Sequence, residues 1–134
     1  MPAPVLHKLH AEIVLKDIER KNNIRVYKPA FLYGAQGPDF FFTHRILPWM
    51  KGEKIAEFGG MFHKTEPLLM LENMREYLTE NSSIELASYF FGFICHYSLD
   101  SVCHPYINAT ARELLELEPK QSLSVMHADI EAAL

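Results

Sequence analysis

One segment in the second half of the chain limits the fold more than any other. Residues 84–103, IELASYFFGFICHYSLDSVC, are apolar on almost every face that a helix would present. A helix that is apolar all round is buried by its neighbours instead of lying on a surface. The sequence therefore predicts a central helix that other helices surround.

Polar side chains recur inside this apolar segment at a spacing of four. They are Ser88, His96 and Asp100, with His104 at the end and Gly92 in the same row, and residues four apart share a helix face. A buried carboxylate without a partner is costly, so a compensating group is expected beside Asp100. Zinc would serve, because it binds imidazole nitrogen and carboxylate oxygen at about 2.0–2.2 Å. A metal-free His–Asp pair that joins two helices is the alternative.

The remaining pattern is helical almost throughout, and we predict an all-α fold, a helical bundle. No repeat or linker interrupts the 134 residues, so we expect a single domain over residues 1–134. A strand at 24–33 is a weaker alternative because of Pro29, and Pro105 predicts a helix end. The expected organisation is a helix at 5–21, a mixed connection at 22–38, a short segment at 39–47, a loop carrying Pro48, Gly52, Gly59 and Gly60, and helices at 67–80, 84–102, 106–117 and 121–134.

A second pair of candidate ligands lies near the C-terminus. His127 and Glu131 are four apart on a predicted helix, so their side chains should share a face. Alone, this pair is weak evidence, because a solvated pair has the same spacing. Two such pairs together with His104 in one small chain favour a metal site.

Two further candidates, Asp39 and His63, precede the central helix, whereas His44 does not qualify as a candidate. Asp39 follows a Gly37-Pro38 turn and comes just before an aromatic run; a helix cap is the alternative role. His63 follows a Gly-Gly pair and precedes a helix start, where a surface loop histidine is the alternative. His44 has no partner at ligand spacing, and we interpret it as a surface residue.

The first predicted helix adds His7 and His10. Both fall within its apolar arc, so we expect both to face the core, where hydrogen-bonded histidines are commoner than metal-bound ones. Asp17 falls near the same arc and is a candidate to orient a histidine from behind. The arc consists of Leu6, Leu9, Ile13 and Val14.

Composition excludes some classes of partner. The formal net charge is −4 and no block of lysine or arginine is present, which argues against a reader of duplex nucleic acid. A small phosphodiester substrate stays compatible, because a bound metal supplies positive charge locally. We identify no signal peptide and no transmembrane segment, and we interpret Cys95 and Cys103 as free thiols. These features predict a cytoplasmic protein.

The ordered residues resemble a known pattern. Gly37-Pro38-Asp39, His63, HYSLDSVCHPY at 96–106 and His127-x-x-x-Glu131 occur in the order seen in the zinc-dependent phospholipase C superfamily. The position of His104 resembles the cytoplasmic, uncharacterised branch of that superfamily. The resemblance covers nearly the whole chain. It implies a helical bundle around two or three zinc ions.

The resemblance also implies roles for individual residues. His63, His96 and Asp100 match the ligands of one zinc, with Asp100 bridging to a neighbouring ion. His127 and Glu131, with His104, match the ligands of another zinc. His7 matches the ligand of the remaining zinc, with His10 as the alternative. Asp39 matches the acidic residue that acts as general base or positions water.

The implied function is zinc-dependent hydrolysis of a phosphodiester or phospholipid-like substrate. Two alternatives stay open: a hydrolase like the single-strand zinc nucleases of the same superfamily, and a non-catalytic helical metal-binding or assembly module. The sequence departs from the family pattern in three places. It begins Met1-Pro2 where secreted members have a processed residue that binds zinc, His104 precedes Pro105 instead of following a proline, and only three residues follow Glu131. One interpretation of the last departure is a shortened chain that lacks elements shaping the substrate site.

Overall fold

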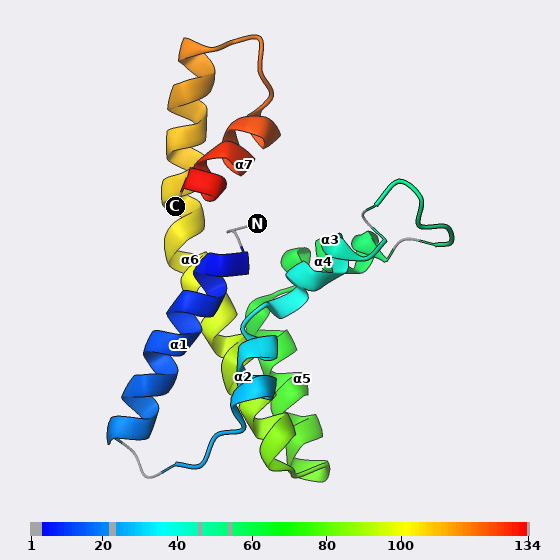
Figure 1. The fold of residues 1–134 in the computed structure, drawn as a ribbon, viewed down its shortest axis with the longest axis vertical. Coiled ribbons are helices and arrows are strands. Elements are labelled where there is room, and N and C mark those ends of the chain that lie inside the picture. Colours follow the sequence, from blue (N-terminus) through cyan, green and yellow to red (C-terminus); the bar gives the residue numbers. More distant parts are fainter. Residues whose placement is uncertain (1–3, 22–23, 46, 54, 134) are drawn as a thin grey trace.

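The computed structural model describes residues 4–21, 24–45, 47–53 and 55–133, and these residues form helices and connections without a strand (Figure 1). The predicted all-α class is confirmed. In chain order the elements are α1 (Pro4–Lys21), α2 (Lys28–Gly34), the 3-10 turn η1 (Gly37–Asp39), α3 (Phe40–Thr43), α4 (Ala56–Lys64), α5 (Pro67–Glu80), α6 (Ile84–Leu117) and α7 (Leu123–Ala133).

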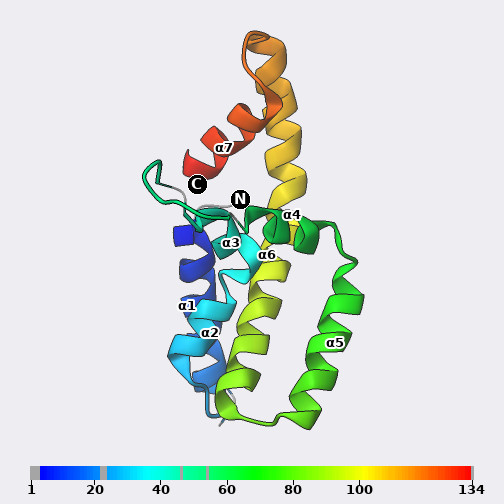
Figure 2. The same cartoon turned by 90° about the vertical axis from the view of Figure 1, so that its right-hand side faces the viewer.

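Helix α6 forms the axis of the molecule, as predicted for the apolar segment. It begins where the Asn81–Ser83 turn suggests, because the Ser83 hydroxyl caps it by accepting a hydrogen bond from the Leu86 amide at 3.0 Å. Its first half lies between α1 and α2 on one side and α5 on the other, and its second half runs beside α7 (Figure 2). Both views show the last turn of α7 near the first turn of α1.

The predicted break at Pro105 is wrong. Helix α6 continues through Pro105 to Leu117, so the expected helices at 84–102 and 106–117 are one element. Proline costs a helix the hydrogen bond from its missing amide to the carbonyl four residues earlier, and such helices bend instead of ending. Figure 1 shows α6 changing direction near its middle. The continuous helix keeps His104 on the same face as His96 and Asp100.

Helix α2 occupies the segment for which a strand was the alternative, and Pro29 lies in its first turn, where proline is well tolerated. The helix packs tightly against α6 through two glycines. A Cβ on Gly34 would overlap the carbonyl of Tyr89, and one on Gly92 would overlap the carbonyl of Phe31. These two positions hold α2 against α6, and η1 follows α2 directly.

The apolar arc predicted for α1 points partly in the wrong direction. Leu9 and Ile13 are 51 % and 65 % exposed, and the buried face is instead His7, Ala11 and Leu15. Those three residues are spaced by four and pack toward α6 and α2. Because a histidine and an alanine carry little hydrophobic signal, the buried face was not the most apolar one.

The glycine-rich stretch before α5 also differs from the prediction. Gly59 and Gly60 belong to α4 instead of a loop, while the predicted helix start at Pro67 and end near Glu80 are confirmed. Both cysteines are free thiols, as predicted. Within the described part of the chain, no helix combines the length and hydrophobicity needed to cross a bilayer.

Candidate metal centre

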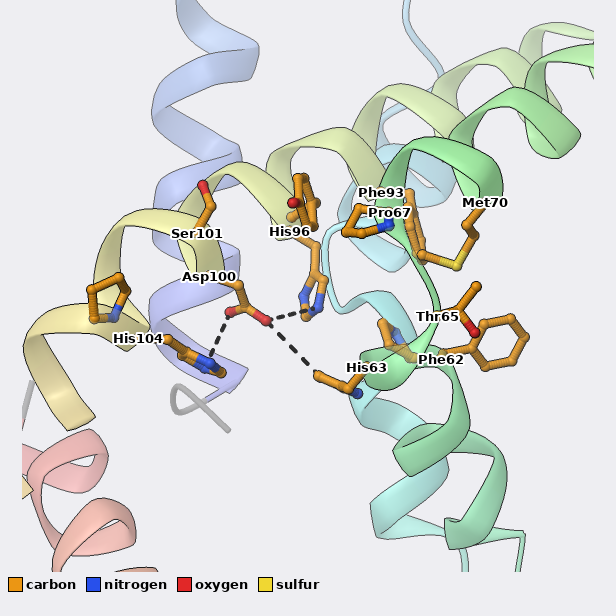
Figure 3. Close-up of a pocket in the computed structure, with 13 residues that line it drawn as sticks. Phe62, His63, Thr65, Pro67, Met70, Phe93, His96, Asp100, Ser101 and His104 are labelled. Atoms are coloured by element: carbon orange, nitrogen blue, oxygen red, sulfur yellow. Dashed lines mark ion pairs between the residues drawn. The ribbon is translucent and has the colours of Figure 1, made fainter.

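Eight acidic and imidazole side chains from five elements meet at the middle of α6, and Figure 3 shows four of them, His63, His96, Asp100 and His104. They divide into two neighbouring sets. We call the first the Asp100 group and define it as His7, Asp39, His63, His96 and Asp100. The second is the Glu131 group, which consists of His104, His127 and Glu131.

Asp100 lies at the centre of its group, with its two oxygens facing different neighbours. Oδ1 is 3.4 Å from Nε2 of His7 and 3.7 Å from Nε2 of His104. Oδ2 is 3.3 Å from Nε2 of His96 and 4.0 Å from Nε2 of His63. Figure 3 shows the carboxylate between three of these rings. A carboxylate so placed can hold one cation with each oxygen.

A hydrogen bond on the far side of the His63 ring determines which of its nitrogens carries the proton. Its Nδ1 lies 2.7 Å from the carbonyl of Gly59, and because a carbonyl only accepts, Nδ1 must donate. In the neutral ring Nε2 then carries the lone pair, and this atom lies 3.0 Å from Oδ1 of Asp39. A lone pair facing a carboxylate is repulsive unless a proton or a metal cation lies between them.

Gly37 explains why Asp39 can reach the same place. Its φ is +55°, a left-handed conformation that favours glycine, and a Cβ there would overlap the ring of His96. Only a residue without a side chain lets η1 pass this close to α6. The turn brings Asp39 in, 3 % exposed, without forming the side-chain cap that was its alternative role.

The Glu131 group joins α6 to α7. Nε2 of His127 lies 2.7 Å from Oε1 of Glu131, and Nε2 of His104 lies 3.8 Å from the same oxygen. Nδ1 of His127 is 3.0 Å from Oδ1 of Asn108, which directs the opposite nitrogen toward Glu131. Asn108 thus plays for His127 the part that the Gly59 carbonyl plays for His63.

Many buried polar atoms of the two groups make no hydrogen bond of good geometry among the described residues. Leaving such atoms unsatisfied in a protein interior is costly. Imidazole nitrogens and carboxylate oxygens are the donor set that zinc prefers, and each of these residues places one ligand atom within 4.8 Å of those of its neighbours, so the residues present fit a metal centre. The atoms are Nδ1 and Nε2 of His7, Oδ1 and Oδ2 of Asp39, Nδ1 of His96, Oδ1 of Asp100 and Nε2 of His104.

Three trios of donors could each hold an ion, with their ligand atoms within 4.8 Å of one another. Two of the trios share His96, and one imidazole nitrogen binds only one ion at a time. The two trios that share His96 would therefore compete for its nitrogen, while the third trio is independent of them. The trios are His7, His96 and Asp100; Asp39, His63 and His96; and His104, His127 and Glu131.

Comparison with known families identifies the family of the chain. The family model described as zinc dependent phospholipase C matches residues 6–132 of the chain. The chain belongs to the zinc-dependent phospholipase C family. No curated protein and no solved structure matches it. Membership makes it part of a hydrolase family whose chemistry depends on zinc, in agreement with the donor set described above.

A cavity of about 290 Å³ opens onto the candidate metal centre of this phospholipase C family member. His63, His96, Asp100 and His104 line one side, and the opposite side is largely apolar (Figure 3). Such a combination suits a ligand with one polar and one apolar part. The apolar lining comes from Pro38, Phe62, Pro67, Met70, Phe93 and Pro105, with the hydroxyl-bearing residues Thr65, Tyr97 and Ser101.

The protein environment keeps two of the rings ready to bind metal. Burial lowers the pKa of His96 to about 4 and also lowers the pKa of His104, so both rings are neutral near pH 7. The pKa of His63 is raised, first by Asp39 beside it. Burial alone would raise the pKa of Asp100, but the side chains of His7 and His96 outweigh it and lower the pKa.

All eight predicted site residues lie in the two groups. Three other residues considered in the sequence analysis, His10, Asp17 and His44, lie outside both groups. His10 is half-buried and contacts Ser98 at 3.4 Å instead of the centre, so the geometry favours His7. Asp17 is exposed and pairs with Arg20 and Lys21, so it orients no histidine. His44 is half-buried, not a surface residue.

Two contributors escaped the sequence analysis, Asn108 and the carbonyl of Gly59. Asn108 continues the spacing-four row of His96, Asp100 and His104, and this signal was available once Pro105 was not taken as a helix end. A backbone carbonyl leaves no such signal in a sequence.

Proposed function

We propose that this chain is a phosphodiesterase of the phospholipase C type, which hydrolyses a phospholipid-like substrate at a centre of two or three zinc ions. One observation carries the proposal. Buried donor atoms without hydrogen bonds line the polar side of a cavity whose other side is apolar. A phosphodiester with an attached apolar group matches both sides.

We propose that Asp39, His63 and His96 hold one ion, and that His104, His127 and Glu131 hold another. His7 and Asp100 would hold a third ion, since Oδ1 of Asp100 is 3.4 Å from Nε2 of His7, while Oδ2 is 3.3 Å from Nε2 of His96. Asp39 was expected to act as general base. Its two buried oxygens, 3.0 Å from His63 and 3.6 Å from His7, support a ligand role, which we propose for it here.

Zinc bound in such a centre would lower the pKa of a bound water to about 7 and stabilise negative charge on phosphate oxygens. The chain's own contribution is positioning. Gly59 and Asn108 fix the orientation of His63 and His127. The apolar wall formed by Phe62, Met70 and Phe93 excludes water and contacts the apolar part of the substrate.

The test measures bound zinc and hydrolysis of a choline phosphodiester in the Asp100→Asn variant. Because Asp100 faces four imidazole rings, we expect at least one zinc fewer per chain and a loss of activity above the roughly 100-fold that removal of an outer partner costs. Asp17→Asn is the matched control, since Asp17 is exposed on α1. Full zinc content and full activity in Asp100→Asn would refute the proposed centre.

The same assays separate the two alternatives. A single-stranded oligonucleotide tested beside the choline phosphodiester distinguishes a nuclease from a phospholipase C, and preferential cleavage of the oligonucleotide would overturn the substrate assignment. A protein that holds zinc firmly and cleaves neither substrate would be the non-catalytic module. Closed four-ligand sites without a water position would accompany that result.

A further inference from the structure

The segment 44–64, which connects α3 to α4 and includes α4, carries five large apolar side chains that are exposed. Trp49 is 72 % exposed. Large apolar residues are normally scattered singly over a surface, whereas several in one short stretch indicate an interaction site. The others in the segment are Leu47 (40 %), Met50 (45 %), Phe58 (52 %) and Met61 (52 %). In Figure 1 the connection before α4 projects away from the helices.

The charge of the same segment is opposite to that of the chain. Residues 44–64 contain four basic residues against two acidic ones, although the whole chain has 13 basic and 17 acidic residues. Lys51 and Lys64 are exposed, and so are the two acidic residues, Glu53 and Glu57. A tryptophan with neighbouring lysines is the composition found at the boundary between a bilayer and water. The net positive charge complements anionic headgroups.

Helix α4 connects this surface to the metal centre. It directs His63 toward Asp39 and Asp100, while Phe58 and Met61 on the same nine-residue helix are exposed. An α-helix with its side chains is about 10–12 Å across. A surface that contacts the outer residues of α4 would therefore lie close to the cavity.

We propose that the segment 44–64 docks on an anionic lipid surface. Trp49 and Met50 enter the headgroup region, Phe58 and Met61 lie against it, and Lys51 and Lys64 contact headgroup phosphates. Docking of this kind is adsorption and needs neither zinc nor hydrolysis. The proposal therefore goes beyond the proposed function, and its test is independent of activity.

Trp49 is the one tryptophan of the chain, so tryptophan fluorescence reports on the proposed docking segment alone. The probe is vesicles of phosphatidylglycerol and phosphatidylcholine in equal parts, with pure phosphatidylcholine vesicles for comparison. We expect a blue shift of the emission and weaker quenching by acrylamide with the anionic vesicles, and a smaller response as salt is raised. Zinc-free protein should respond in the same way.

Variants then test whether the segment carries the binding. Trp49→Ala should bind the anionic vesicles about tenfold more weakly in co-sedimentation, because burial of an aromatic side chain is lost. Tyr77→Ala is the matched control, since Tyr77 is an aromatic residue on α5 that is 57 % exposed. Circular dichroism of both variants verifies that they fold.

Three results would overturn the proposal. The first is an unchanged Trp49 emission with anionic vesicles. The second is equal vesicle binding by Trp49→Ala and Tyr77→Ala. The third is a blue shift that grows with protein concentration in the absence of lipid, which would mean that a second copy of the chain covers the segment.

Discussion

The Asp100 group and the Glu131 group, the two halves of the candidate metal centre, are built in different ways. The Asp100 group draws its side chains from α1, η1, α4 and α6; those of His7 and His96 are 1 % and 4 % exposed, and that of His63 is 27 % exposed. The Glu131 group comes from α6 and α7 alone, and two of its members, His104 and His127, are 29 % and 22 % exposed. The first half depends on the packing of most of the chain, whereas the second depends on one helix pair. Ions in the first half should therefore leave more slowly and matter more to stability.

Zinc removal should produce the largest effect and should occur in two steps. A site saturated at 1,000 times its dissociation constant stabilises the folded state by about 4 kcal/mol, so removal of one ion held this tightly by the Asp100 group should lower Tm by roughly 10–20 °C. Chelator titration with a zinc-sensitive dye, followed by calorimetry, measures both quantities. We expect the ion of the Glu131 group to leave first with a small change in Tm. Release of all zinc in one step would contradict the distinction between the two halves.

Gly37→Ala should damage the Asp100 group alone. A left-handed conformation costs an L-residue roughly 1–2 kcal/mol, and displacement of the His96 ring adds roughly as much, so we expect about 3 kcal/mol of destabilisation in urea. Gly60→Ala is the control, because a Cβ there meets nothing within 4 Å and alanine favours a helix. Equal stability of the two variants would mean that η1 is not held tightly against α6.

His127→Gln should remove the ion of the Glu131 group and leave the Asp100 group loaded. We expect the zinc affinity of that group to fall by more than about 100-fold, because loss of an outer partner alone reaches that range. Equilibrium dialysis with mass-spectrometric zinc analysis gives the count. His10→Gln, which lies outside both groups, should retain all zinc; loss of zinc there would reinstate His10 as a ligand.

Asn108→Ala should have the smallest effect. Because Asn108 contacts Nδ1 of His127 and not the centre itself, we expect a 10- to 100-fold loss of zinc affinity, roughly the range for outer partners, confined to the Glu131 group. Asn73→Ala on the exposed side of α5 is the comparison. An Asn108 variant with unchanged affinity would show that the carboxylate of Glu131 orients His127 unaided.

The sequence predicted which side chains come together better than it predicted the helices around them. The row His96, Asp100 and His104 and the pair His127 and Glu131 could be identified because one helix places its members by spacing alone. The ends of α5 and the start of α6 followed from Pro67 and Ser83, whose local chemistry determines where helices begin. Family membership was likewise recognisable from the order of these motifs along the chain.

The parts that failed depend on contacts between elements. Pro105 was taken as a break because local rules disfavour it, yet the packing of α7 and α1 along α6 compensates for one lost hydrogen bond. The choice of His7 over His10 depends on which face of α1 packs against α6. The most apolar arc of α1 predicted the wrong face. Gly59 and Gly60 were predicted to lie in a loop because glycine disfavours helices. Both lie in α4, where Gly59 packs against Phe42.

An anomalous difference map at the zinc absorption edge, from crystals of zinc-loaded protein, tests the central claim most directly. We predict one or two peaks among His7, Asp39, His63, His96 and Asp100, and a further peak among His104, His127 and Glu131. A map without peaks at these side chains, or with peaks only at the molecular surface, would contradict the account.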